Sequence, residues 1–243
     1  MLGLPDSVHV CLFDLDGVLT DTASVHRAAW KDTFDPVLKA HGLPEFTADD
    51  YAEYVDGKPR LDGTRDFFAS RNLDLPEGDD DDPDDAETIH AVAKRKNAEV
   101  QQHIQDDGVV VFDDARVYLE AARAAGLRRI VVSSSANTEQ VLQVTGLVEL
   151  VEGRVDGRTI DEQHMRGKPA PDSFLAGAAL VGADPSNAAV FEDATAGAEA
   201  GRSGRFGAVV GVNRLDDRHG SELRAHGATV VVHALTDLLP GSA

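Results

Sequence analysis

The sequence predicts an α/β fold in which helices cover both faces of a parallel sheet and an all-helical segment interrupts the chain. Two observations favour this fold. From about residue 109 onward, short apolar runs alternate with helical segments, which is typical of a parallel sheet. Between residues 23 and 105, by contrast, no stretch has the pattern of a strand. We therefore expect a Rossmann-like core domain of residues 1–22 and 106–243, and a helical domain of residues 23–105 inserted into it.

The first expected elements are a buried strand that ends at Phe13 and a series of helices. Residues 24–40 carry apolar side chains at helical spacing, and Gly42-Leu43-Pro44 ends that pattern. Shorter helices are expected at 48–55 and 63–70, and a long one at about 86–105. Glu77–Asp85, an acidic run between them, is interpreted as a solvated loop.

The second half of the chain supplies the remaining strands and helices. Strands are expected at 129–132, 188–191, 208–212 and 229–232. Helices are expected at 114–125, 138–146, 172–182, 195–203 and 219–226. In such sheets, ligands bind beyond the carboxyl ends of the strands. Polar residues at those ends are therefore the candidates for function.

The composition narrows the classes of partner. The 43 acidic and 23 basic residues give a net charge of −20, which argues against nucleic acid or an anionic membrane surface as a partner. No apolar run approaches the ~18 residues of a membrane span. Cys11 is the single cysteine and fits a reducing compartment, so we expect a cytoplasmic protein. Inside a strand, Cys11 is interpreted as a packing residue.

Two carboxylates, Asp14 and Asp16, follow the first strand, and Gly17 comes directly after them. Their spacing points both side chains the same way, where like charges repel unless a cation, a proton or chemistry offsets them. A calcium loop of the EF-hand type is excluded, because the glycine comes too early and a strand precedes it. A solvated Asp-rich turn remains possible for this segment alone.

Three later strand ends carry polar residues of matching kinds. Ser133, Ser135 and Asn137 follow one strand, where they could hold phosphate oxygens or simply cap the next helix. Lys168 lies between a glycine and a proline, in a rigid context suited to an anion. Glu192-Asp193 forms a second acidic pair, which would complete an oxygen-only site suited to Mg²⁺.

These segments together resemble the haloacid dehalogenase superfamily of phosphotransferases over nearly the whole chain. Within the superfamily, the chain is most similar to the β-phosphoglucomutase group. The cues for that group are Asp21-Thr22, His26 in Val25-His26-Arg27-Ala28-Ala29-Trp30, Lys94-Arg95-Lys96-Asn97, Lys168-Pro169-Ala170-Pro171-Asp172, and Glu192-Asp193.

The resemblance implies roles for the core residues. Asp14 would be the nucleophile that forms an aspartyl-phosphate, and Asp16 the general acid/base. Ser133 and Lys168 would hold the transferring phosphoryl group. Mg²⁺ would be bound by Asp14, the Asp16 backbone carbonyl and Asp193, with Glu192 close by.

The resemblance also implies substrate-binding residues in the helical domain and the core. Arg60 would grip the phosphate that is not transferred, and Lys96 would bind substrate beside it. His26 would coordinate closure of a cap with acid/base positioning. The remaining expected substrate-binding residues are Thr22, Ser135 and Asn137.

Two departures from the group fall on substrate recognition. Ala136 stands where a lysine or arginine is usual, and Gly57-Lys58-Pro59-Arg60 replaces the usual Gly-Val-Ser-Arg. Lys58 is a candidate to replace the missing charge.

The leading expectation is a monomeric enzyme that converts β-glucose 1-phosphate to glucose 6-phosphate through the 1,6-bisphosphate. A sugar-phosphate phosphatase is the alternative on the same fold, and a catalytically silent binding module is the third possibility.

Overall fold

The computed structural model describes residues 2–106 and 108–241. The chain divides into two compact units. The core unit comprises Met1–Asp21 and Val109–Ala243, and the helical unit comprises Thr22–Gly108. That the helical unit acts as a cap stays a prediction.

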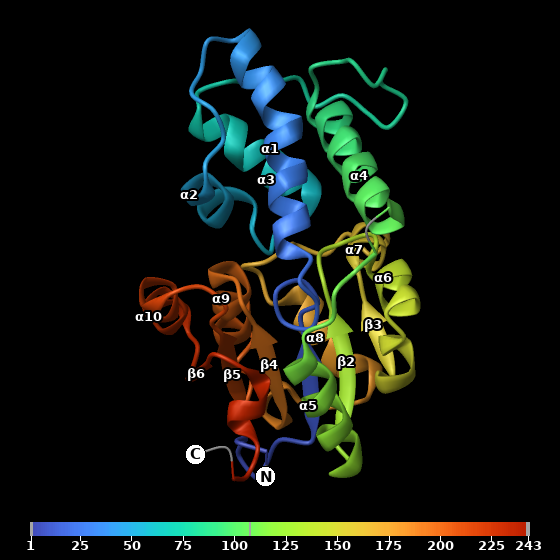
Figure 1. Cartoon of the computed structure of the whole chain (residues 1–243), viewed down its shortest axis with the longest axis vertical. Helices are drawn as coiled ribbons and strands as arrows, with labels where there is room; N and C mark the ends of the chain where they lie inside the picture. The colour runs from blue at the N-terminus through green and yellow to red at the C-terminus, as the bar shows by residue number, and fades with distance from the viewer. Residues whose placement is uncertain (1, 107, 242–243) are drawn as a thin grey trace. The chain divides into compact units, whose positions relative to one another are not determined.

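A six-stranded parallel sheet forms the centre of the core unit, in the order β3-β2-β1-β4-β5-β6 (Figure 1). The predicted parallel α/β core is therefore confirmed. The strands are β1 (Val10–Phe13), β2 (Arg128–Val132), β3 (Gly153–Val155), β4 (Ala188–Glu192), β5 (Ala208–Val212) and β6 (Val230–Val232).

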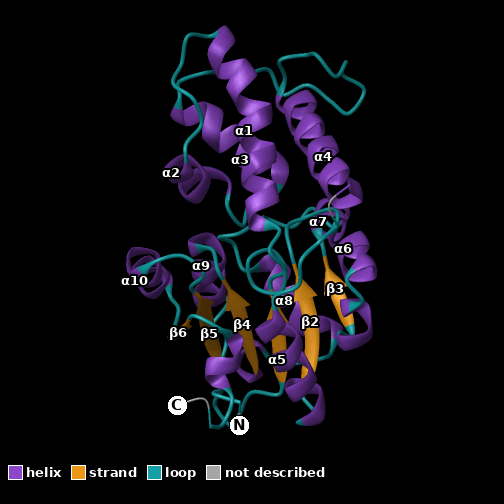
Figure 2. Cartoon of the chain, viewed as in Figure 1, coloured by secondary structure: helices purple, strands orange, loops and turns teal. Residues whose placement is uncertain are grey.

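Alternating side chains of the buried strands pack against helices on opposite faces of the sheet. On one face, Leu12 of β1 belongs to a buried cluster with Ile130 and Phe174. On the other, the Phe13 ring stacks on Phe191 with ring centres 4.5 Å apart and meets the edge of Tyr118 at 6.2 Å. Helices α5, which carries Tyr118, and α8, which carries Phe174, therefore cover opposite faces (Figure 2).

Five helices of the core unit agree with the expected ones to within a few residues. They are α5 (Asp113–Ala124), α6 (Thr138–Val144), α8 (Asp172–Leu180), α9 (Thr195–Ser203) and α10 (Asp217–His226). The described core residues also form α7 (Gly157–Glu162) and the short 3₁₀ turns η2 (Leu147–Leu150), η3 (Pro185–Asn187) and η4 (Leu235–Leu238). Neither β3 nor α7 was predicted. Both are short, and β3 lies at an edge of the sheet, so neither has a long apolar pattern.

In the helical unit, the described residues contain α1 (Ala23–Ala40), α2 (Ala48–Asp50), the π-helix η1 (Tyr51–Val55), α3 (Arg60–Ser70) and α4 (Ile89–Asp106). The single helix expected at 48–55 is thus a short α-helix that continues as a π-helix. The helix expected from about residue 86 begins at Ile89. Aromatic rings form the centre of this unit, where Phe34 stacks on Phe67 at 4.4 Å.

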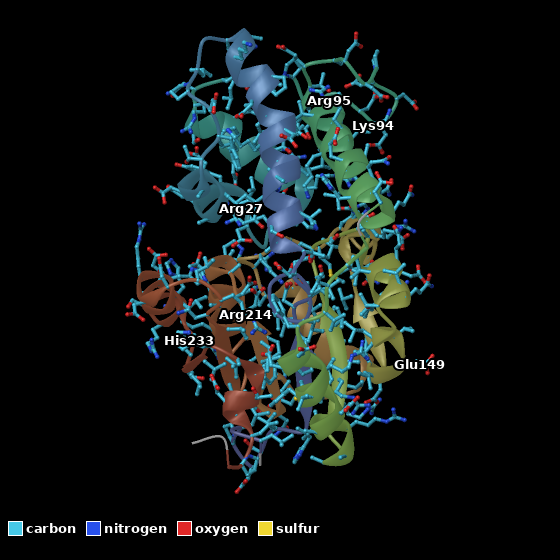
Figure 3. The ribbon with its side chains drawn as sticks, viewed as in Figure 1. Arg27, Lys94, Arg95, Glu149, Arg214 and His233 are labelled. Carbon is cyan, nitrogen blue, oxygen red and sulfur yellow. The ribbon has the colours of Figure 1, made fainter. Side chains whose placement is uncertain are left out.

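The acidic run at 77–85 is an exposed loop, as expected, but its charges have basic and hydroxyl partners within the helical unit. Thr88 donates to the Asp82 carboxylate at 2.6 Å, and Lys94 of α4 pairs with Asp84 at 2.9 Å. Arg95 donates to the Ala86 carbonyl at 2.9 Å. Figure 3 labels Lys94 and Arg95, which anchor this acidic loop to α4.

Among the described residues, none of the helices combines the length and the apolar composition that crossing a membrane requires.

Candidate active site

The ends of β1 and β4 lie at the point where the order of the sheet reverses. Strands β2 and β3 extend the sheet on one side of β1, and β4, β5 and β6 extend it on the other. Such a switch point leaves a crevice beyond the carboxyl ends of the two central strands. Phe13 of β1 is the register partner of Phe191 of β4. Asp14 and Glu192, the next residues, therefore occupy the same position along their two strands. The Asp14 backbone N–H donates to the Phe191 carbonyl at 2.9 Å.

Lys168 joins these two strand ends. Its Nζ donates to Asp14 Oδ1 and to Glu192 Oε1, each at 2.6 Å, and all three side chains are buried. Burial raises the pKa of the Asp14 carboxyl well above its ordinary value, although Lys168 acts in the opposite direction. Burial alone would lower the Lys168 pKa, but Asp14 and Glu192 raise it above its usual value. The lysine therefore stays charged.

Asp16 lies in a different environment, two residues further along the loop. Its side chain is partly buried, and its Oδ2 accepts a hydrogen bond from the Ser133 hydroxyl at 3.3 Å. Gly17 allows the turn, since its φ is +81° and a Cβ there would lie 1.7 Å from Asp193 Oδ2. The loop that carries Asp16 therefore packs directly against Asp193.

Asp14, Glu192 and Asp193 could hold a metal ion. Each offers a carboxylate oxygen, and the three oxygens lie within 4.8 Å of one another. Lys168 pairs with Asp14 and Glu192, and Asp193 adds a third carboxylate to this group, so its negative charge is in excess. This oxygen-rich donor set fits a hard divalent cation.

In the segment after β2, residues 133–137, serine hydroxyl groups accept hydrogen bonds from the backbone of the segment itself. Ser133 Oγ accepts from the Ser135 N–H at 3.1 Å, and Ser135 Oγ accepts from the Asn137 N–H at 3.2 Å. Asn137 occupies the N-cap position of α6, but its side chain makes no capping hydrogen bond there. Simple helix capping by Asn137 therefore does not explain this segment.

The turn between β3 and α7 supports the same segment and was not found from the sequence. The Ser133 N–H donates to the Val155 carbonyl at 3.0 Å, and the Gly157 N–H donates to the Ser135 carbonyl at 3.0 Å. A Cβ on Gly157 would lie 2.6 Å from the Ser134 carbonyl oxygen, so a larger residue would displace the segment.

Four of the predicted site residues lie in the helical unit. His26 and Lys96 come together there: Lys96 Nζ lies 2.7 Å from His26 Nδ1 and 4.7 Å from the centre of the Trp30 ring. Lys96 is buried. Thr22 is also buried and precedes α1, where its carbonyl accepts from the His26 N–H at 2.9 Å.

Arg60 begins α3, directly after the Gly57-Lys58-Pro59 turn. Lys58, considered as a substitute for the charge missing at Ala136, instead pairs with Asp66 at 2.6 Å. Its charge is thus engaged inside the helical unit.

Two further residues that contact the site were missed, and both follow β5. Arg214 donates to the carbonyl oxygens of Gly17 and Val18, and His219 Nε2 lies 2.7 Å from the Asp193 carbonyl oxygen. The rule applied to the other strands, that polar residues after a strand end are candidates, would have singled out Arg214.

Residues 8–205 match the model of the haloacid dehalogenase-like hydrolase family. The chain belongs to the haloacid dehalogenase superfamily. Its sequence is 53% identical to the β-phosphoglucomutase of Mycobacterium tuberculosis (strain CDC 1551 / Oshkosh), over 98% of this chain and 94% of that protein. This superfamily member therefore falls in the β-phosphoglucomutase-like group.

The chain also has more distant relatives, which include both a mutase and a phosphatase. It is 29% identical to the β-phosphoglucomutase of Bacillus subtilis (strain 168), over 87% of this chain and 86% of that protein. It is also 29% identical to the fructose-1-phosphate phosphatase YqaB of Escherichia coli (strain K12), over 82% of this chain and 93% of that protein.

The fold of this superfamily member also matches solved structures. The crystal structure of β-phosphoglucomutase from Clostridium difficile superposes with a TM-score of 0.77. The match covers 95% of this chain and 93% of that one, at 22% identity, and shows a shared fold.

Proposed function

We propose that the protein is a Mg²⁺-dependent mutase that interconverts β-glucose 1-phosphate and glucose 6-phosphate through the 1,6-bisphosphate. The observation that carries this proposal is the pair of aspartates at the end of β1. Asp14 is buried against Lys168, and Asp16 is partly buried against Ser133, so the two carboxylates have separate environments suited to separate roles.

In the first half-reaction, a carboxylate oxygen of Asp14 attacks the phosphorus atom of the C1 phosphate of the 1,6-bisphosphate, so that glucose 6-phosphate is the leaving group. The bond between phosphorus and the sugar oxygen breaks, and an aspartyl-phosphate forms. Protonated Asp16 gives its proton to the leaving sugar oxygen. Lys168 and Ser133 hold the phosphoryl oxygens as charge moves onto them.

In the second half-reaction, Asp16 takes the proton of the C6 hydroxyl of β-glucose 1-phosphate, and the 1,6-bisphosphate is formed again. The hydroxyl oxygen attacks the phosphorus atom, and the Asp14 carboxylate leaves as an anion. Asp16 is then protonated and Asp14 is ionised, as at the start of the cycle. The two transfers therefore balance without a further reactant.

Mg²⁺ fits the oxygen donors at the ends of β1 and β4. Asp14, the Asp16 backbone carbonyl and Asp193 are the residues assigned to hold it, with Glu192 close by. When bound, Mg²⁺ would offset the charge of the carboxylates and the phosphoryl group.

The proposed substrate-binding residues are those implied by the family resemblance. They are Thr22, His26, Arg60, Lys96, Ser135 and Asn137. The contact between His26 and Lys96 supports a joint role for that pair, because a lysine ammonium beside an imidazole restricts the positions of both.

A sugar-phosphate phosphatase is the second candidate, supported by the likeness to the fructose-1-phosphate phosphatase. Water would then replace the sugar hydroxyl in the second half-reaction. The mutase is favoured because the mycobacterial mutase is 53% identical over nearly the whole chain, against 29% for the phosphatase.

Phosphorus NMR distinguishes the two candidates. The protein is incubated with Mg²⁺, β-glucose 1-phosphate and a catalytic amount of the 1,6-bisphosphate. A mutase converts the glucose 1-phosphate signal into that of glucose 6-phosphate. Accumulation of inorganic phosphate without glucose 6-phosphate would contradict the mutase and favour the phosphatase.

A further inference from the structure

Arg214 contacts the backbone of the loop that carries Asp16. It follows β5 by two residues, and its side chain is 19% exposed. Its Nη2 donates to the Val18 carbonyl at 3.2 Å, and its Nε donates to the Gly17 carbonyl at 3.4 Å. These two carbonyl groups belong to the two residues directly after Asp16. Arg214 therefore acts on the loop through its backbone, without touching the Asp16 carboxylate in these contacts.

The rest of the guanidinium group is held by other elements of the core unit. Its Nη2 also pairs with Asp114 Oδ2 at 2.9 Å, at the start of α5, and its Nη1 donates to the His233 carbonyl at 3.2 Å. Its Cζ lies 4.0 Å from the centre of the Phe112 ring. Figure 3 labels Arg214 and His233. A planar guanidinium fixed at several points is a rigid anchor for the carbonyl groups that it binds.

The Asp16 loop also has hydrogen bonds of its own, which set its shape. The Gly17 N–H donates to the Thr20 carbonyl at 2.8 Å, and the Leu19 N–H donates to the Leu15 carbonyl at 2.9 Å. These bonds lie within the loop, whereas Arg214 joins the loop to α5 and to the segment after β6. Arg214 thus fixes the direction in which the loop presents Asp16.

We propose that Arg214 is a positioning residue that holds Asp16 where it can protonate the leaving oxygen of the substrate. The inference rests on the proposed role of Asp16 as the general acid. It assigns Arg214 to the proton transfer and not to attack by Asp14, because Arg214 binds the loop after Asp16. Asp14 is held separately, by Lys168 and by its hydrogen bond to Phe191.

This assignment predicts an effect that depends on the leaving group. A sugar oxygen is a poor leaving group and needs a proton as the bond to phosphorus breaks. The p-nitrophenolate ion is a good leaving group and needs none. Loss of Arg214 should therefore slow reaction of the sugar phosphate and leave reaction of p-nitrophenyl phosphate nearly unchanged.

The test compares four proteins, with Mg²⁺ present. On β-glucose 1-phosphate, with a catalytic amount of the 1,6-bisphosphate, kcat and KM are measured. On p-nitrophenyl phosphate, rapid mixing measures the rate of the first release of p-nitrophenolate. Arg214→Met removes the donors but keeps an apolar stem. Arg214→Lys keeps the charge with one donor group. Arg116→Met is the matched control. Arg116 is also a half-buried arginine, and it donates to the backbone carbonyl of Thr145. Arg116 and Thr145 both lie outside the proposed site. The wild-type protein completes the set.

For Arg214→Met we expect kcat on glucose 1-phosphate to fall by about 10- to 100-fold, the range of a misplaced catalytic group, with KM changing much less. The rate of the first release of p-nitrophenolate, before any aspartyl-phosphate is hydrolysed, should change by less than about threefold, which also shows that the variant is folded. Arg214→Lys should recover part of the loss, and Arg116→Met should behave as wild type.

An equal loss on both substrates, or no loss on either, would overturn the inference while leaving the proposed function intact. A wild-type protein that hydrolyses glucose 1-phosphate would contradict the mutase. The comparison of leaving groups would still test Arg214, since hydrolysis needs the same proton. A wild-type protein inactive on both substrates would contradict both proposals.

Discussion

The two aspartates after β1 differ in the groups that surround them. Burial raises the pKa of the Asp14 carboxyl, and the Lys168 ammonium at 2.6 Å acts against that shift, toward the ionised form that a nucleophile needs. Asp16 is less buried and has a hydroxyl group as its partner. A group that exchanges protons with a substrate suits this second environment.

Replacement of Asp16 tests its assigned role. We expect Asp16→Asn to lower kcat on glucose 1-phosphate by about 10²- to 10⁴-fold, the usual contribution of a general acid/base. Steady-state kinetics measure the change, and Asp113→Asn, which alters an exposed carboxylate in the first turn of α5, is the control. Unchanged turnover in Asp16→Asn would contradict the role of Asp16 as the general acid/base.

The thiol of Cys11 is expected to be unreactive in the folded protein. Cys11 is fully buried in β1, and burial raises its pKa to about 12. We expect no reaction of the native protein with a thiol reagent at pH 8, and one thiol per chain after unfolding in guanidinium chloride, by absorbance. Fast labelling of the native protein would show that β1 is accessible to the reagent, which would contradict the burial of Cys11.

At the scale of elements, α7 depends on Asp156. Its carboxylate accepts from the Thr159 N–H at 2.9 Å, as an N-cap, and from Arg154 Nε at 2.8 Å. Burial would raise the pKa of Asp156, but these hydrogen bonds lower it below its ordinary 3.8. The ionised form is therefore favoured in the folded state.

A lowered pKa in the folded state means that Asp156 stabilises the fold above pH 3.8 and that this contribution fades as the pH falls through the folded-state value. We expect Asp156→Asn to lower the free energy of unfolding by at most about 1 kcal/mol at pH 7. The difference from wild type should shrink below about pH 4. Urea unfolding at several pH values measures it. A difference that grows as the pH falls would contradict the assignment.

The sequence predicted the long elements of the core because each has a clear pattern. Buried strands such as β4 are continuous apolar runs, and polar residues mark their ends. The sequence did not predict β3 and α7, because they are three and six residues long. So few positions do not reveal the spacing of apolar residues that identifies a strand or a helix.

Contacts between segments distant in the sequence could not be predicted in the same way. Lys168 can contact both Asp14 and Glu192 because β1 and β4 are neighbours in the sheet. A single sequence does not reveal this order of the strands. The contacts of Arg214 with Gly17 and Val18 depend on the course of the loop after β5. The sequence thus marked polar residues at strand ends as candidates, but the hydrogen bonds among them, and the contacts of Arg214 and His219, required the fold.

At the scale of the whole molecule, a net charge of −20 and a cluster of carboxylates at the carboxyl ends of β1 and β4 both favour binding of cations. We expect Mg²⁺ to raise the melting temperature of chelator-treated protein. The gain is about 2.7 kcal/mol when Mg²⁺ is 100 times its Kd. Asp193→Asn should lose most of this gain, and Asp217→Asn, an exposed carboxylate on α10, should keep it.

Mg²⁺ could also raise the melting temperature only by screening the negative charge of the protein, and this case gives a different result. NaCl at the same ionic strength would then raise the melting temperature as much as Mg²⁺ does, and the two variants would respond alike. That outcome would contradict a specific site at Asp14, Glu192 and Asp193.

The central claim is that Asp14 carries the phosphoryl group between two sugar oxygens. The most direct measurement is reductive trapping: the protein is mixed with Mg²⁺ and glucose 1,6-bisphosphate, and borohydride then reduces any acyl phosphate to an alcohol. Peptide mass spectrometry locates the modified residue. We expect homoserine at position 14, and none in protein incubated without substrate. Homoserine at another carboxylate, or at none while turnover proceeds, would contradict it.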